Sequence, residues 1–258
     1  FCLGAFGAIP GIILQCCVKD RGIPDHDLSA SDQTNNPVKL VFGRSHRRAL
    51  FSCMLVTSFL IGTFYLNFVW LPIFMKTLLK PSIPNAFAIN SSTIFFYLLL
   101  GPLIGMLSDY CGERKIMLIG MIGTMVSGPV MVYVITIANG VGACFAQACL
   151  VVTISFGTFP LFAMTAKTFP PMVRLTGVAF GYNVASAMLA GTVPALATYL
   201  VDKYSPHTPG YIFAALSIIG IIGLCVAPKL HEEASEFDES VDSISGVGDE
   251  EAMRGNLQ

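Results

Sequence analysis

Six amide and aromatic side chains lie within long apolar stretches, and they are the residues best suited to bind a polar molecule. Asn and Gln each offer hydrogen-bond donors and acceptors, and aromatic faces attract quaternary ammonium groups. Polar side chains inside such stretches tend to face an interior cavity, and hydrogen bonding between helices is the competing explanation for each. For Trp70, a place in an aromatic belt at the membrane surface is a further alternative. The candidate cavity residues are Tyr65, Asn67, Trp70, Tyr97, Gln147 and Asn183.

Catalytic chemistry has little support from the residues that usually perform it. An enzyme needs a nucleophile, a base or metal ligands that converge on one site. The four histidines are scattered among loops and chain ends, and the eight cysteines form no Cys-x-x-Cys pair. No Gly-Lys-Ser/Thr element is present to hold nucleotide phosphates. We therefore expect no catalytic residues, no metal, no cofactor and no nucleic-acid partner, so that the chain is not an enzyme.

The apolar stretches around the polar residues are long enough to cross a membrane. The sequence is 54% hydrophobic and 12% charged, against about 25% charged in soluble domains. Roughly 18 apolar residues cross a hydrocarbon core as a helix, and lipid requires a backbone that satisfies its own hydrogen bonds. The sequence therefore predicts an all-α membrane protein with a bundle of six transmembrane helices. The expected spans are Ala49–Phe74, Phe87–Leu107, Ile116–Ile137, Val141–Met164, Gly177–Val201 and Tyr211–Ala227.

Polar and apolar segments divide the chain into four expected parts. Residues 1–18 are apolar but begin at Phe1 without a basic leader, so we expect the end of a truncated transmembrane helix, and a chain that is a fragment. Residues 19–48 are rich in Pro, Asn, Asp and Ser, which predicts a cytoplasmic linker loop. Residues 49–228 are expected to form the six-helix transmembrane bundle. Residues 229–258 are acidic, which predicts a disordered tail.

The distribution of Lys and Arg predicts the orientation in the membrane, because basic residues in short loops stay on the cytoplasmic side. Twelve of the fifteen fall on the side of the linker and the tail, and three, Lys76, Lys80 and Lys203, fall on the other side. We therefore expect a multi-pass protein of the plasma (inner) membrane, with the linker and the carboxy-terminal tail in the cytoplasm.

The turn between the second and third expected spans contains a compact set of Gly, Asp and basic residues. Gly suits a short turn, Asp at a helix end can accept hydrogen bonds or face a neighbouring helix N-terminus, and the basic pair anchors the cytoplasmic face. The pattern resembles the cytoplasmic signature loop of the major facilitator superfamily. It departs from that loop at Tyr110 and Glu113, where basic residues are usual, so we expect a weaker gating lock. The matching residues are Gly105, Asp109, Gly112, Arg114 and Lys115.

A second pattern lies at the start of the fifth span and within it. The pair Pro170-Pro171 favours a non-helical start, because the residue before a proline avoids the helical region. An Arg holds the cytoplasmic end, and a proline within the span is expected to bend the helix. Together with a Tyr-Asn pair at 182–183, these residues resemble the eleventh helix of the metabolite:proton symporters, which include proline/betaine, dicarboxylate, citrate, 2-oxoglutarate and shikimate carriers. The residues of the helix start and the helix break are Arg174, Gly177, Gly191 and Pro194.

Together the two resemblances imply that the six spans are helices seven to twelve of a twelve-helix carrier, whose amino-terminal half is missing from this chain. They imply a secondary active transporter that moves a small polar metabolite with protons by alternating access, with a compatible solute such as proline or betaine favoured. Two alternatives stay open: an organic-acid symporter for dicarboxylate, 2-oxoglutarate or shikimate, and a membrane remnant that does not transport. The expected partners are the lipid bilayer, the small-molecule substrate, protons and the missing six-helix half.

Overall fold

The structure is a computed structural model that describes residues 43, 46–83, 85–137, 140–169 and 171–228. The expected helix end at 1–18, most of the linker at 19–48 and the tail at 229–258 lie outside the described residues. Within the described ranges the chain is helical, with turns between the helices and no strand. Six helical stretches there are long and apolar enough to cross a membrane, which confirms the predicted fold class.

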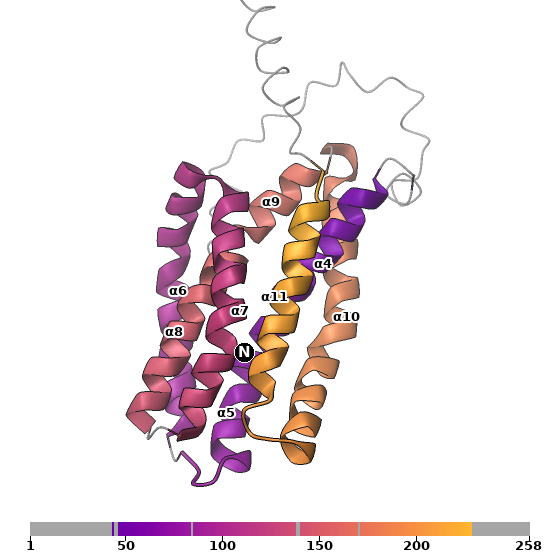
Figure 1. Cartoon of the computed structure of the whole chain (residues 1–258). Coiled ribbons are helices and arrows are strands. Elements are labelled where there is room, and N and C mark those ends of the chain that lie inside the picture. Colours follow the sequence, from indigo (N-terminus) through magenta and orange to yellow (C-terminus); the bar gives the residue numbers. More distant parts are fainter. Residues whose placement is uncertain (1–42, 44–45, 84, 138–139, 170, 229–258) are drawn as a thin grey trace, which may run out of the picture. The chain divides into compact units, whose positions relative to one another are not determined.

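The helices follow the expected spans in order (Figure 1). The first span is one helical stretch made of α4 (Arg47–Phe64), the π-helical turn η2 (Tyr65–Trp70), the short α5 (Leu71–Ile73) and a second π-helical turn, η3 (Phe74–Leu78). The second and third spans are α6 (Ala86–Cys111) and α7 (Glu113–Ile137). The remaining helices are α8 (Gly140–Thr158), α9 (Leu161–Thr168), α10 (Pro171–Lys203) and α11 (Pro209–Val226).

The fourth span is not the single uninterrupted helix expected over Val141–Met164. It consists of α8 and α9, and the helix is interrupted at Phe159 and Pro160. Pro160 has no N–H with which to continue the hydrogen-bond ladder, so it explains a break that apolarity did not indicate. After α9, Phe169 has the extended backbone (φ −112°, ψ 141°) expected of a residue that precedes a proline.

The first and fourth spans lie inside the bundle. In their most apolar windows 67% and 56% of the residues are buried, against 17% in the second and fifth spans. α11 packs against α4 and α7, α7 packs against α8, α10 packs against α4, and α6 packs against α8. Large apolar side chains such as Leu98 on α6 and Met188 on α10 are exposed. Such a surface is one that lipid or other helices cover.

Glycine lets α7 approach its neighbours closely. A Cβ atom on Gly120 would lie 2.2 Å from the backbone nitrogen of Gly157 in α8. Further along α7, a Cβ atom on Gly128 would lie 2.5 Å from Cβ of Phe213 in α11. Small residues allow membrane helices to pack this tightly, so α7 is held between α8 and α11 at two points that have no room for a side chain.

Many hydroxyl side chains in the spans bond to their own helix. Thr124 donates to the carbonyl oxygen of Gly120 at 2.8 Å, and Ser217 donates to that of Phe213 at 2.8 Å. In both pairs the acceptor lies four residues earlier in the same helix, which is a common arrangement for Ser and Thr. These hydroxyls therefore need no partner from another helix.

Candidate functional site

The first span departs from regular α-helix where three of the candidate residues lie. In η2 the backbone N–H of Leu71 bonds to the carbonyl of Leu66, five residues earlier, and the next residue, Pro72, has no N–H to offer. The carbonyl oxygens of Asn67 and Phe68 therefore lack the donors that an α-helix would supply four residues further on. π-helical turns inside α-helices are frequent at functional sites.

Two side-chain amides from other spans supply the missing donors. Asn90 of α6 donates through Nδ2 to the Phe68 carbonyl oxygen at 3.1 Å. Gln147 of α8 donates through Nε2 to Oδ1 of Asn90 at 3.1 Å, and it lies 3.4 Å from the Asn67 carbonyl oxygen. We call Asn67, Asn90 and Gln147 the amide cluster. It joins the first, second and fourth spans at the π-helical turn.

Three polar atoms of the amide cluster have no partner among the described residues. They are Oδ1 and Nδ2 of Asn67 and Oε1 of Gln147, and both side chains are 0% exposed. An unpaired buried group of this kind costs about 1–3 kcal/mol, and each one in a native structure calls for an explanation. A small polar ligand that both donates and accepts hydrogen bonds would satisfy all three atoms.

Trp70 lies within the bundle and not on its lipid-facing surface. It is 3% exposed, its indole N–H donates to Oγ1 of Thr198 in α10 at 2.8 Å, and its ring stacks on Phe74 with 4.9 Å between ring centres. A place in an aromatic belt at the membrane surface, the alternative from sequence, does not fit this burial. The indole instead links the first span to the fifth. Its partner there, Thr198, lies four residues after Pro194.

Tyr97 occupies the face of α6 that meets the first and fourth spans. Its hydroxyl bonds to that of Thr158 at 2.9 Å, and its ring stacks on Phe159 with 4.6 Å between ring centres. The Phe68 and Tyr97 rings pack edge to face, with 5.2 Å between ring centres. Because the carbonyl of Phe68 accepts from Asn90, Tyr97 adjoins the residue that anchors the amide cluster.

The six candidate residues do not come together as one site. Asn183 is exposed on α10 and its amide donates to the carbonyl of Ala179 in its own helix at 2.8 Å. Tyr65 is half-buried, and its hydroxyl has no hydrogen bond among the described residues. Asn90, absent from the six, is a member of the amide cluster. The signal for it was Pro72, which removes the donor that Phe68 would otherwise use.

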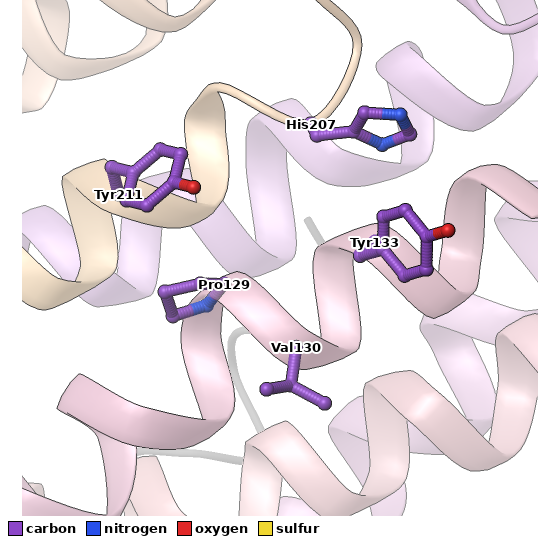
Figure 2. A pocket seen from close by; sticks show the side chains of 5 residues that line it. All are labelled: Pro129, Val130, Tyr133, His207 and Tyr211. Atoms are coloured by element: carbon purple, nitrogen blue, oxygen red, sulfur yellow. The ribbon is translucent and has the colours of Figure 1, made fainter.

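Pockets open on the described part of the bundle, and the two described next are lined by none of the six candidates. A hollow of about 270 Å³ between α7 and α11 is lined by Pro129, Val130, Tyr133, His207 and Tyr211 (Figure 2). A second, of about 600 Å³, lies among mostly apolar residues at the starts of α6 and α8. The amide cluster is therefore closed off from both hollows in this arrangement of the helices.

The turn between α6 and α7 has the geometry that its sequence predicts. Gly112 has φ +90°, which side chains disfavour, and this sharp turn ends α6. Arg114 reaches across to α11 and donates through Nη2 to the carbonyl oxygens of Ala227, at 3.0 Å, and of Pro228. Positive charge at the last carbonyls of a helix is favourable, so Arg114 ties the turn to the end of the sixth span.

The other charged residues of this turn differ in their contacts. Glu113 is buried and its carboxylate pairs with the ammonium of Lys167 in α9 at 2.7 Å. Asp109 and Lys115 are exposed, and their side chains make no hydrogen bond or ion pair within the described ranges. The negative charge of Glu113 is thus paired within the bundle, whereas the carboxylate of Asp109 is available to a partner outside the described residues.

The candidates at the start and the break of the fifth span lie on α10. Arg174 is exposed and its Nε is 3.4 Å from the carbonyl oxygen of Phe169. A Cβ on Gly177 would meet the Phe169 ring at 2.6 Å, whereas one on Gly191 would meet nothing within 4 Å. Pro194 lies within a helix that continues on both sides of it, and the expected bend stays a prediction.

Comparison with known sequences decides the family. The sequence matches the Major Facilitator Superfamily over residues 53–249. The chain belongs to the major facilitator superfamily. The signature-loop resemblance at residues 105–115 lies inside the matched range, and within the described residues no group of three or more His, Cys, Asp or Glu side chains could hold a metal.

Relatives in the superfamily carry transporter names. A Staphylococcus aureus (strain COL) protein named "Putative proline/betaine transporter" is 23% identical over 232 residues, covering 86% of this chain and 48% of the relative. The proline/betaine transporters of Salmonella typhimurium (strain LT2) and Escherichia coli (strain K12) are 26% and 25% identical over 69% and 68% of this chain, and 35% of each relative. The chain spans about half the length, or less, of these curated relatives. No solved structure gives a significant match.

Proposed function

We propose that this chain is the carboxy-terminal half of a secondary active transporter, which carries a small polar metabolite with protons by alternating access. A compatible solute such as proline or betaine is the favoured substrate. Membership of the superfamily and the names of its relatives support a transporter. The observation that carries the substrate class is the amide cluster, because its buried, unpaired atoms can both donate to and accept from a polar guest.

The site in this proposal is neutral. Asn67 and Gln147 hold the solute, and Trp70 and Tyr97 form aromatic walls that suit a solute with a cationic nitrogen. No Asp, Glu, Lys, Arg or His lies deep in the described spans, so a dianionic organic acid would find no counter-charge in them. Tyr65 and Asn183, on less buried surface, are proposed to line the solute path toward the missing half.

The proposal also assigns the chain a place in a larger protein. The six spans act as helices seven to twelve, and solute enters from between this bundle and the missing six-helix half to reach the amide cluster. The end of the bundle with the α6–α7 turn faces the cytoplasm, together with the linker and the tail, in the plasma (inner) membrane. The described basic residues at the helix ends favour this orientation. Those near that end are Arg47, Arg48, Arg114, Lys115, Lys167 and Arg174, against Lys76, Lys80 and Lys203 at the opposite end.

Proton coupling is tested with the full-length protein in sealed vesicles. We expect uptake of labelled proline or betaine to rise when a pH gradient, acid outside, is imposed, and to fall to the passive level when a protonophore collapses the gradient. Vesicles without the protein are the control for leak. Uptake that does not respond to the protonophore would rule out proton symport.

Asp109 is proposed to act in gating, since it is exposed and has no partner in the described part of this half. We expect Asp109→Asn to slow uptake by at least roughly ten-fold, because a hydrogen bond to a charged group contributes about 1.5–3 kcal/mol and about 1.4 kcal/mol is a factor of ten in rate. The amount of protein in the membrane should not change. Initial rates of uptake, divided by immunoblot abundance, measure the effect.

Cys111→Ser is the matched control for this experiment, because Cys111 is an exposed thiol two residues further along the same turn. It should transport at the wild-type rate. Equal rates for Asp109→Asn and wild type would show that this carboxylate has no part in gating.

A further inference from the structure

We propose that Asn90 is a positioning residue that orients the carboxamide of Gln147, so that Gln147 can only accept a hydrogen bond from the solute. The site then selects solutes that carry an N–H donor over fully methylated ammonium compounds. This inference rests on the proposed function and names the chemistry of the substrate that the same site prefers.

The orientation begins at the backbone of the first span. The carbonyl oxygen of Phe68 can only accept, and Pro72 leaves it without the usual donor of its own helix. Asn90 has a donor end and an acceptor end. Only its Nδ2 end can bond to that carbonyl, and Nδ2 lies 3.1 Å from it. The amide of Asn90 is therefore fixed in one of its two orientations.

The same logic fixes the next amide. With Nδ2 of Asn90 on Phe68, its Oδ1 faces Gln147, and an oxygen must be met by a donor. Gln147 meets it with Nε2, at 3.1 Å, and the same nitrogen lies 3.4 Å from a second acceptor, the carbonyl of Asn67. Both acceptors beside Gln147, Oδ1 of Asn90 and the carbonyl of Asn67, therefore require its NH₂ group. Its Oε1 is buried and has no hydrogen-bond partner among the described residues.

A solute that bonds to Oε1 must therefore supply a hydrogen. A secondary ammonium such as that of proline has two N–H groups, whereas a quaternary ammonium such as that of betaine has none. The carboxylate that both solutes share can accept from Nδ2 of Asn67, which is also unpaired. Oε1 is buried in the arrangement described here, so the solute meets it when the helices separate during transport. The cluster thus binds the carboxylate that the two solutes share but distinguishes them by their nitrogen.

The test compares three competitors that differ only in methylation at nitrogen: proline, N-methylproline and N,N-dimethylproline. Each is titrated against uptake of labelled proline by the full-length protein in vesicles. For wild type we expect dimethylproline to bind at least about ten-fold more weakly than proline, the effect of losing a hydrogen bond to a charged donor. N-methylproline, which keeps one N–H, should lie closer to proline.

Two variants separate orientation from packing. Asn90→Leu leaves only the more distant carbonyl of Asn67 to orient Gln147, so Oε1 is held less firmly toward the solute. The ratio of the affinities for proline and dimethylproline should then fall toward one, while dimethylproline binding is retained. Gln147→Leu removes Oε1, so proline affinity should drop to that of dimethylproline. Ser91→Ala is the matched control: Ser91 is exposed, next to Asn90, and bonds only to its own helix at 3.0 Å. It should keep the wild-type ratio.

The outcomes distinguish this inference from the proposed function. If wild type binds proline and dimethylproline equally well, the inference fails although transport stands, and this result needs no variant to fold. An unchanged ratio in Asn90→Leu would also overturn the role of Asn90. If wild type takes up none of these solutes, the proposed function fails and the inference fails with it.

Discussion

Gly120→Ala is expected to separate α7 from α8 and to lower the stability of the bundle more than the same change at any other described glycine. The new Cβ would lie 2.2 Å from the backbone nitrogen of Gly157 and 2.5 Å from the backbone carbon of Phe156. Backbone atoms inside a helix cannot rotate away as the end of a side chain can, so the two helices must move apart. Overpacking in a tight core typically costs about 1–3 kcal/mol, and a contact this short with backbone belongs at the upper end.

The measurement is the thermal midpoint of the full-length protein in detergent, together with the fraction that elutes as a single species. Gly140→Ala is the matched control, because its new Cβ would have Ile83 Cγ2 at 3.7 Å as its nearest neighbour, an ordinary contact. It should unfold at or slightly above the wild-type temperature, since alanine favours a helix more than glycine does. Equal midpoints for the two variants would mean that α7 and α8 are not this close.

Arg114→Met is expected to loosen the end of the sixth span. Methionine keeps much of the aliphatic stem but leaves the carbonyl oxygens of Ala227 and Pro228 without the guanidinium that bonds to them. A hydrogen bond to a charged group contributes about 1.5–3 kcal/mol, and the charge also opposes the negative end of the helix dipole. We expect amide hydrogens in the last turn of α11 to exchange faster with deuterium, with little change in the middle of the helix.

Lys115→Met is the control for that measurement, because it removes a neighbouring positive charge whose side chain makes no hydrogen bond or ion pair with a described group. Hydrogen exchange followed by mass spectrometry resolves the two variants at peptides that cover residues 220–227. If both variants exchange like wild type in that region, Arg114 does not hold the end of α11.

The six spans and the α6–α7 turn could be predicted from sequence because each depends on a local property. Uninterrupted apolarity is enough to indicate a membrane helix, and a glycine between two helices is enough to indicate a sharp turn, as φ +90° at Gly112 confirms. The partner of Arg114 could not be predicted, since Ala227 lies 113 residues further along the chain. Only the packing of α7 on α11 brings the two together.

The composition of the candidate site was harder to predict, because it depends on how each helix is rotated. The apolar residues of α10 mark no single face of the helix, so its sequence does not show that Asn183 would be exposed or that Trp70 would be buried against it. The π-helical turn at Tyr65–Trp70 shifts the register of the first span, and hydrophobic periodicity does not reveal such a turn. Pro72, inside the apolar first span, is the one readable sign, because a residue without an N–H leaves a carbonyl four residues earlier in need of another donor.

The hydroxyls that bond to their own helices have a consequence for biogenesis. A span whose Ser and Thr are already satisfied can leave the translocon and enter lipid alone, without waiting for a neighbour. The carbonyls of Asn67 and Phe68 and the amides of Asn90 and Gln147 are not satisfied in this way, because their hydrogen bonds join three different spans. Pairing at that point is completed only after α8 has been inserted, so these buried groups of the first and second spans wait for the fourth span.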